Sequence, residues 1–270
     1  MAINFNKVPR YIHAEIDPPT KIIEQGVKNG TVQRIQEWLN YHQIRTVIDN
    51  DYGPATRECI RNFQKKTDLP ITGKVNKKTW EALVSPIHSA LSQPSQIESL
   101  SASEVVMIIA TQHVEQRPFE IGGANEGPWV RLYCGGYHGR DWAWCAGFVT
   151  LIMHQAYFYR GQRSPIKGSV SCDSLAAQAK RAGLFVPGHS IVRGEVNWNS
   201  LGDCCIFLKR RTATDWTHAG IAFGARGSSK SIVFFTIEGN TNDEGSREGY
   251  EACRRIRSLG SGSYDFIAFK

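Results

Sequence analysis

The sequence predicts an α+β protein with a small helical domain followed by a larger domain that contains an antiparallel sheet. Two observations support this class. Apolar residues recur at helical spacing in segments as far as residue 183. From residue 204 onwards, short apolar runs bounded by Gly, Asp, Ser and Lys are typical of strands. Helices followed by several strands favour α+β, and 270 residues suffice for two domains.

Three short helices are predicted in the first domain, which spans residues 30–84. They cover 32–39, 54–63 and 79–83, where apolar residues lie on one helical face. Pro54 suits the first position of the second helix because it needs no backbone N–H there. Residues 1–29 form an N-terminal lead-in, which we expect to be extended with a short helix at 21–27.

The first domain resembles a known module. The matching pieces are VQRIQEWLN at 32–40, DYGPAT at 51–56, FQ at 63–64, TG at 72–73 and TW at 79–80. Together they resemble the type 1 peptidoglycan-binding domain found at the ends of many cell-wall hydrolases. The resemblance implies a three-helix fold and binding to peptidoglycan. The loops at 49–52 and 72–74 are the segments that we expect to contact the polymer.

Residues 85–100 are rich in Ser and Pro and are predicted to be a linker. The second domain then spans residues 101–270. It begins with a capping-box spacing at Ser101 and Glu104 before a helix. A Gly-rich polar loop at 116–140 follows, which we expect to shape the approach to the site described next. Aromatic side chains of this region either line a groove there or pack the loop down: Trp129, Tyr133, Tyr137, Trp142 and Trp144.

Cys145 lies where this loop gives way to an apolar run. The residues after it place Phe148, Val149 and Ile152 on one face of a helix, so Cys145 falls in the first turn. Unpaired N–H groups and the positive dipole end of a helix favour thiolate over thiol. A thiolate is the nucleophile needed for acyl transfer. The alternative is a small buried cysteine that only packs the core.

Strands are predicted at 204–208, 219–223, 231–237 and 264–269, after a further helix at 174–183. His218 begins the second of these strands and shares a face with Gly220 and Ala222. We expect a helix carrying Cys145 to approach this small-residue face, which would let His218 take the thiol proton. Alternatively, His218 is a surface imidazole at a strand edge.

A third group that orients the imidazole is expected after the next strand, which ends in Glu238 and Asn240. An ordinary turn is the alternative for this stretch. Asp203 and Asp215 are further acids in the vicinity, so the sequence leaves the identity of the third member open.

Four sequence blocks of the second domain resemble blocks of a known family and occur in the same order as in that family. They are DWAWCAGFV at 141–149, LGDCCIFLKR at 201–210, THAGIAFG at 217–224 and IEGNTNDEGSREGYE at 237–251. They are similar to the CHAP amidase/peptidase domain of the wider NlpC/P60-like, papain-related group. The resemblance implies a papain-like α+β fold without a cofactor. It also implies that Cys145 is the nucleophile, His218 the base and then the acid, Glu238 the orienting group and Asn240 an auxiliary polar group.

Together the two resemblances indicate a peptidoglycan hydrolase similar to phage endolysins. The sequence favours an N-acetylmuramoyl-L-alanine amidase, with a peptide-stem endopeptidase as the alternative, because both cleave amides with the same residues. A non-catalytic peptidoglycan-binding protein is the alternative from another class. A cysteine-dependent transferase or deamidase toxin would use the same triad but would leave the binding module unexplained.

The amino-acid composition limits the classes of binding partner that we expect. The net charge of +7 suits an anionic partner such as an acidic cell-wall polymer. Lys and Arg are scattered, so nucleic acid is not expected. Seven cysteines cannot all pair within the chain, which indicates reduced thiols. No close Cys/His quartet is present, so we expect no metal.

The sequence begins without an apolar signal segment, and no apolar run reaches about 18 residues, the length that a spanning helix needs. We therefore expect no transmembrane segment and synthesis in the cytoplasm without a signal peptide. Action on the cell wall would then follow release or delivery, through a holin or secretion machinery. An immunity protein would accompany an injected effector.

Overall fold

The computed structural model describes residues 9–227, 232–242, 249–260 and 264–269. It confirms the predicted α+β class, with helices first and an antiparallel sheet in the C-terminal part. The chain divides into two compact units. The helical unit contains Asn4–Ala90 and Phe119–Asp141, and the sheet unit contains Leu91–Pro118 and Trp142–Lys270.

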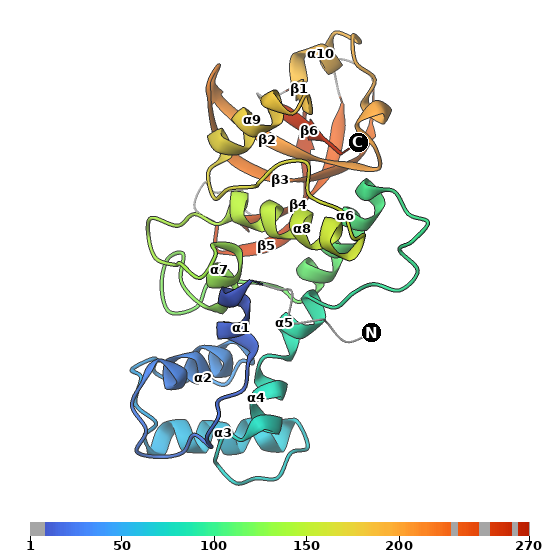
Figure 1. The fold of residues 1–270 in the computed structure, drawn as a ribbon. Coiled ribbons are helices and arrows are strands. Elements are labelled where there is room, and N and C mark those ends of the chain that lie inside the picture. Colours follow the sequence, from blue (N-terminus) through green and yellow to red (C-terminus); the bar gives the residue numbers. More distant parts are fainter. Residues whose placement is uncertain (1–8, 228–231, 243–248, 261–263, 270) are drawn as a thin grey trace. The chain divides into compact units, whose positions relative to one another are not determined.

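The three helices predicted in the N-terminal part are present in the helical unit (Figure 1). They are α2 (Gly30–Tyr41), α3 (Pro54–Lys66) and α4 (Lys77–Leu83). Asn29 caps α2 by accepting hydrogen bonds from the backbone N–H groups of residues 31 and 32. As predicted, Pro54 occupies the first turn of α3.

The helix predicted at 21–27 is wrong. Ile23 instead forms a β-bridge with Val75, and the helix of the lead-in is α1 (Arg10–Ile16). The segment 17–20 contains Asp-Pro-Pro, and a residue before proline is driven out of the helical region, so α1 ends there.

Two buried glutamines hold the loops of the helical unit in the same way. The Gln36 Oε1 atom accepts hydrogen bonds from the backbone N–H groups of residues 49 and 50, each at 3.0 Å. The Gln64 Oε1 atom accepts from those of residues 72 and 73, each at 2.9 Å. These are the loops expected to contact peptidoglycan, and a helix fixes the backbone of each. Tyr52 is buried, so its ring is not available to a polymer.

The segment 119–141 belongs to the helical unit, whereas the sequence analysis placed it in the second domain. It contains α7 (Pro128–Tyr133), and Arg131 of this helix is buried between two carboxylates. Arg131 Nε donates to Glu15 Oε1 at 2.7 Å, and Nη2 donates to Glu37 Oε2 at 2.6 Å. A buried cation needs such partners, so the segment is bound to α1 and α2 by charge.

Aromatic packing holds the same segment. The Trp129 ring lies edge-on to Trp38 of α2, with ring centroids 6.2 Å apart, and it stacks on Tyr133. Both α7 rings are buried. Of the two alternatives left open by the sequence, these two rings therefore pack the loop down. Trp144 is also buried, whereas Tyr137 is exposed.

The segment predicted to be a linker, 85–100, begins with a helix, α5 (Ser85–Ala90). Ile87 and Ala90 of this helix are buried, as are Leu91 and Ile97 beyond it. Its Ser and Pro content suggested a flexible chain, but apolar residues between them are spaced closely enough to be buried.

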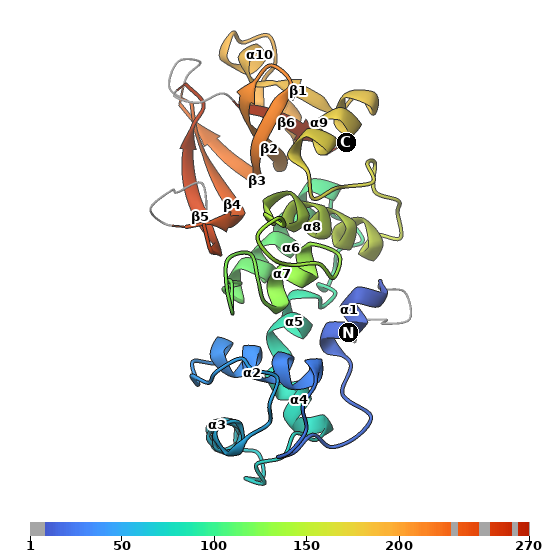
Figure 2. The same ribbon diagram turned by 90° about the vertical axis from the view of Figure 1, so that its left-hand side faces the viewer.

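The sheet unit is built on one antiparallel sheet with the strand order β1-β6-β2-β3-β4-β5 (Figure 1). Its strands are β1 (Phe185–Pro187), β2 (Cys204–Thr212), β3 (Asp215–Arg226), β4 (Val233–Thr241), β5 (Glu251–Ser258) and β6 (Tyr264–Ala268). Its helices are α6 (Ala102–Glu115), α8 (Cys145–Tyr159), α9 (Cys172–Arg181), α10 (Gly188–Val192) and a 3-10 turn at Trp198–Leu201. Helix α8 contacts β3 and β4 and lies beside α6, as both views show (Figures 1 and 2).

The four predicted strands correspond to β2, β3, β4 and β6, although residue 231 of the third lies outside the described residues. Strands β1 and β5 were not predicted. Strand β5 has the sequence EACRRIRS and lies at the sheet edge, so it has no continuous apolar run.

Helix α8 does not approach the sheet where the sequence analysis expected. A side chain at Gly220 would meet the Phe207 ring at 2.5 Å and Glu238 at 2.8 Å, not α8. The close approach occurs at Gly239, where a Cβ would lie 2.7 Å from the Trp144 ring and 2.8 Å from Phe148. The absence of a side chain at residue 239 therefore lets the first turn of α8 rest on β4.

Candidate active site

Cys145 is the first residue of α8, as the sequence predicted, and its side chain is buried. The residue before it, Trp144, is the N-cap, and its backbone N–H donates to Asn240 Oδ1 at 2.8 Å. Asn240 has a positive φ of 54° and also donates from Nδ2 to the Gly249 carbonyl at 3.0 Å. Asn240 thus holds the helix start that carries Cys145.

His218 and Glu238 meet where strands β3 and β4 separate. The β3–β4 ladder ends at the pair of Gly220 with Glu238, and beyond it the strands no longer pair with each other. Lys209 pairs with His218, and the β2–β3 register shifts at the next position. Such irregularities turn a side chain out of the regular alternation. The His218 ring donates from Nε2 to Glu238 Oε2 at 2.8 Å.

Glu238 is fully buried and accepts hydrogen bonds on both oxygens. Arg257 of β5 donates from Nε to Oε1 at 2.8 Å and from Nη2 to Oε2 at 2.5 Å. The Thr236 hydroxyl donates to Oε1 at 2.5 Å. Burial raises the pKa of Glu238, but the bonds from His218 and Arg257 outweigh it and lower the pKa to about 2. Glu238 is therefore a carboxylate at neutral pH.

The Cys145 thiol lies close enough to the His218 ring for the charge and hydrogen-bonding capacity of each to shift the pKa of the other. Burial lowers the pKa of His218, but the interactions with Cys145 and Glu238 prevail and raise it to about 9. The pKa of Cys145 lies well below its usual value, because of a hydrogen bond with Cys172 and the charge and hydrogen bond of His218, which together exceed the opposing effect of burial. Both shifts favour the thiolate and imidazolium forms of the pair.

Cys172, the first residue of α9, completes the site. Its Sγ lies 4.0 Å from Cys145 Sγ, and neither thiol belongs to a disulfide. The site thus brings sulfur, imidazole, carboxylate and guanidinium groups into contact. They come from α8, α9 and strands β3, β4 and β5.

The four predicted site residues therefore converge in the sheet unit, but in different roles. Cys145, His218 and Glu238 form a row of contacts, whereas Asn240 binds backbone. The spare acids lie elsewhere: Asp203 accepts from the Ser103 hydroxyl at 2.8 Å, and Asp215 pairs with Arg211. Among the acids considered from sequence, Glu238 is the one that contacts the His218 ring. Residues 243–248 of the fourth family block lie outside the described residues.

Sequence reasoning missed Cys172, Thr236 and Arg257. Arg257 lies on β5, whose polar sequence gave no strand signal. A buried glutamate such as Glu238 requires a cationic partner, but several arginines near the C-terminus could supply one. Cys172 belongs to a helix predicted to start at residue 174, two positions too late.

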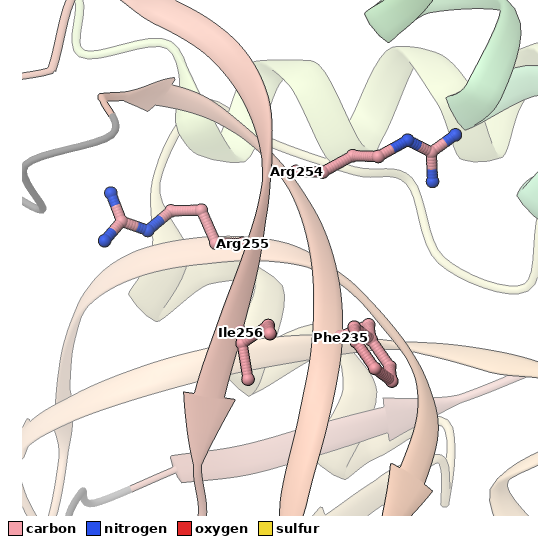
Figure 3. A pocket seen from close by; sticks show the side chains of 4 residues that line it. All are labelled: Phe235, Arg254, Arg255 and Ile256. Atoms are coloured by element: carbon pink, nitrogen blue, oxygen red, sulfur yellow. The ribbon is translucent and has the colours of Figure 1, made fainter.

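A pocket outside this site lies on β4 and β5 and is lined by Phe235, Arg254, Arg255 and Ile256. Figure 3 shows Phe235 and Ile256 side by side, with the two arginine side chains pointing in opposite directions. Arg254 reaches Thr111 at 3.4 Å. The Nε and Nη1 atoms of Arg255 are buried without a hydrogen-bond partner among the described residues. This pocket offers cations and apolar surface but no nucleophile.

Among the described residues, no group of three or more His, Cys, Asp or Glu side chains is arranged to hold a metal ion. In the same part of the chain, no helix has the length and apolar character needed to cross a membrane.

The comparison with protein families finds one match. Residues 28–83 match the family described as "Putative peptidoglycan binding domain". This range contains α2, α3 and α4, together with the two loops held by Gln36 and Gln64. The match supports a peptidoglycan-binding domain near the N-terminus of the chain, and with it peptidoglycan as a partner. No curated protein and no solved structure matches the chain.

Proposed function

We propose that the protein is a cysteine-dependent peptidoglycan hydrolase that cleaves an amide bond of the bacterial cell wall. The single observation that carries the proposal is the row of contacts from Cys145 through His218 to Glu238. A thiolate activated by an adjacent imidazole, itself oriented by a buried carboxylate, is the arrangement used for nucleophilic acyl transfer. The peptidoglycan-binding domain on the same chain supplies the substrate class.

In the proposed reaction, the Cys145 thiolate attacks the carbonyl carbon of the amide. Backbone N–H groups at the start of α8 stabilise the oxyanion of the tetrahedral intermediate. The His218 imidazolium gives its proton to the leaving amine as the C–N bond breaks, which leaves a thioester on Cys145. The neutral imidazole then takes a proton from water, and the resulting hydroxide releases the carboxylic acid and restores the thiolate.

Glu238 keeps the imidazole in position throughout the proposed cycle. It accepts from Nε2 of His218, so the other ring nitrogen is directed away from the carboxylate and is available to the sulfur and the substrate. Arg257 and Thr236 in turn fix the carboxylate. Asn240 acts as a positioning residue, because it holds the backbone immediately before the nucleophile.

The proposal has two forms, which differ in the amide bond of the wall that is cleaved. An N-acetylmuramoyl-L-alanine amidase is favoured, and a peptide-stem endopeptidase is the alternative. Both use the same residues. We also propose that the protein acts on the wall after release or delivery from the cytoplasm.

The test uses the full-length protein and purified peptidoglycan sacculi. We expect wild type to release soluble fragments and Cys145→Ala to release none, while both co-sediment with the sacculi to the same extent. Cys205→Ala is the matched control, because Cys205 is also buried but lies in the sheet core. Mass spectrometry of the fragments separates amidase from endopeptidase by the new termini.

Undiminished hydrolysis by Cys145→Ala would refute the proposed nucleophile. Binding of wild type without any hydrolysis would favour the non-catalytic binding protein, in which Cys145 has a structural role.

A further inference from the structure

Cys172 is a second buried thiol at the proposed nucleophile. Its side chain is 7% exposed, and its sulfur lies 4.0 Å from that of Cys145. The two residues are the first of their helices, α9 and α8, and are 27 positions apart in the sequence. The role of Cys145 in the proposed reaction leaves the neighbouring thiol unexplained.

The position of Cys172 is fixed by hydrogen bonds around it. The Ser171 hydroxyl caps α9 by accepting from the Ser174 N–H at 3.3 Å. Next to Cys172, Asp173 Oδ1 accepts from the Trp216 backbone N–H of β3 at 2.7 Å. Helix α9 is thereby attached to the strand that carries His218, so both partners of the Cys145 sulfur come from connected elements.

The surroundings also determine which of the two sulfurs keeps its proton. The bond with Cys145, burial and the nearby charges of Cys145 and Asp173 all raise the pKa of Cys172. His218 acts on Cys145 in the opposite direction. These opposite effects favour Cys172 as the S–H donor and Cys145 as the acceptor across the 4.0 Å between the two sulfurs.

We infer that Cys172 is a positioning residue for the nucleophile: its S–H donates a hydrogen bond to the Cys145 sulfur and holds it in place beside the His218 ring. The inference deepens the proposed function and rests on it. A thiolate bound by two donors from different elements has a defined orientation. It also needs less stabilisation from the imidazolium alone.

The experiment compares Cys172→Ala, which removes the donor, with Cys172→Ser, which keeps an O–H donor. The rate of Cys145 alkylation by iodoacetamide is measured from pH 4 to 9 on the folded full-length protein, with peptide mapping to assign the site. Every unit by which the midpoint rises lowers the thiolate fraction about tenfold at pH values below it. We expect Cys172→Ala to raise the midpoint by about one unit and Cys172→Ser to restore most of the shift.

Cys205→Ala serves again as the control and should leave the profile unchanged. Circular dichroism checks folding, and Cys172→Val, which fills the volume without a donor, replaces Cys172→Ala if that variant unfolds. The same alkylation profile in wild type and in the donor-free variant would overturn the inference. Alkylation needs no substrate, so this outcome is distinct from a failure of the hydrolase proposal, which the sacculus digest reports.

Discussion

Both units of the protein bury an ion cluster with a histidine beside it, but the histidine contacts opposite ends of the cluster. In the helical unit, the His138 ring lies 3.4 Å from Nη1 of Arg131. Burial and then the Arg131 charge lower the pKa of His138. In the sheet unit, the His218 ring contacts Glu238, and its pKa is raised to about 9. Burial thus prevails at His138 and is reinforced by Arg131, whereas the interactions with Cys145 and Glu238 outweigh burial at His218.

The two ion clusters also differ in their numbers of cations and carboxylates. Arg131 is one buried cation between two buried carboxylates, and the partly exposed Arg34 is a second cation at Glu15. Glu238 is one carboxylate between Arg257 and His218, and His218 can release its proton to a substrate. The first arrangement can only connect helices, whereas the second can connect strands and also orient a proton donor. Four variants or conditions test this difference, and the largest effect is expected at Glu238.

Glu238→Gln should reduce hydrolysis of sacculi by about 10²- to 10⁴-fold. The substitution removes the negative charge that orients the imidazole and helps to keep it protonated. The rate is measured per folded protein by release of soluble fragments. Glu37→Gln, in the cluster of the helical unit, is the control and should leave the rate per folded protein unchanged. Equal rates in Glu238→Gln and wild type would remove Glu238 from the proposed mechanism.

Arg131→Met should lower the free energy of unfolding of the helical unit by about 3–5 kcal/mol, because it leaves the buried Glu37 without a cation and Glu15 with only the partly exposed Arg34. Urea denaturation of the full-length protein measures the change. Arg34 also contacts Glu15, at 3.3 Å, but its side chain is 30% exposed. Arg34→Met should therefore cost only about 1 kcal/mol or less. Similar losses in both variants would contradict the difference between the buried and the partly exposed arginine.

This cluster also explains a limit of the sequence analysis. The motif at 30–84 predicted the three helices and the binding module, because its turn and capping residues act locally. That Arg131, almost fifty residues later, pairs with Glu15 and Glu37 depends on a tertiary contact that no local pattern encodes. A fragment ending at residue 90 lacks this arginine, so binding to peptidoglycan is best measured on the complete chain.

The candidate site was predictable to a similar extent. Cys145, His218 and Glu238 stood out because the sequence places them in order at a predicted helix start and at the ends of two predicted strands, although His218 and Glu238 lie within the longer β3 and β4 of the structure. The route by which they meet was not predictable. It depends on Gly239 as the contact point for α8 and on a separation of β3 from β4, and both are properties of the assembled sheet. Arg257 was missed because it lies on a polar edge strand.

The pH dependence should separate the two histidines. The pKa of His218 is raised from 6.5 to about 9, so its protonated form persists up to about pH 9 and is lost above it. Hydrolysis should therefore fall as the pH rises through about 9, by about tenfold per unit beyond it, because His218 no longer protonates the leaving amine. His138→Gln should leave this alkaline fall in the hydrolysis rate unchanged. A fall in the rate near pH 6.5 instead would indicate that Cys145 and Glu238 do not raise the pKa of His218.

The raised pKa has a matching effect on stability. The contribution of the protonated His218 is complete below its unfolded value of 6.5 and is lost as the pH rises through about 9. Urea denaturation at pH 6 and pH 10 should show this loss in wild type, and the loss should be smaller in His218→Ala.

The smallest effect is expected at Asn240, which lies two residues from Glu238 but holds backbone rather than a proton. Asn240→Gly removes the acceptor of the Trp144 N–H and tolerates the positive φ of 54°, so it should cost about 1 kcal/mol in stability. Asn240→Ala should cost about 1 kcal/mol more, because a Cβ is unfavourable at that φ. Hydrolysis by the glycine variant should fall less than tenfold. If it fell as far as in Glu238→Gln, the Asn240 side-chain amide would have to contact the reacting atoms. The distinction between Glu238, which orients the proton donor, and Asn240, which holds backbone, would then be wrong.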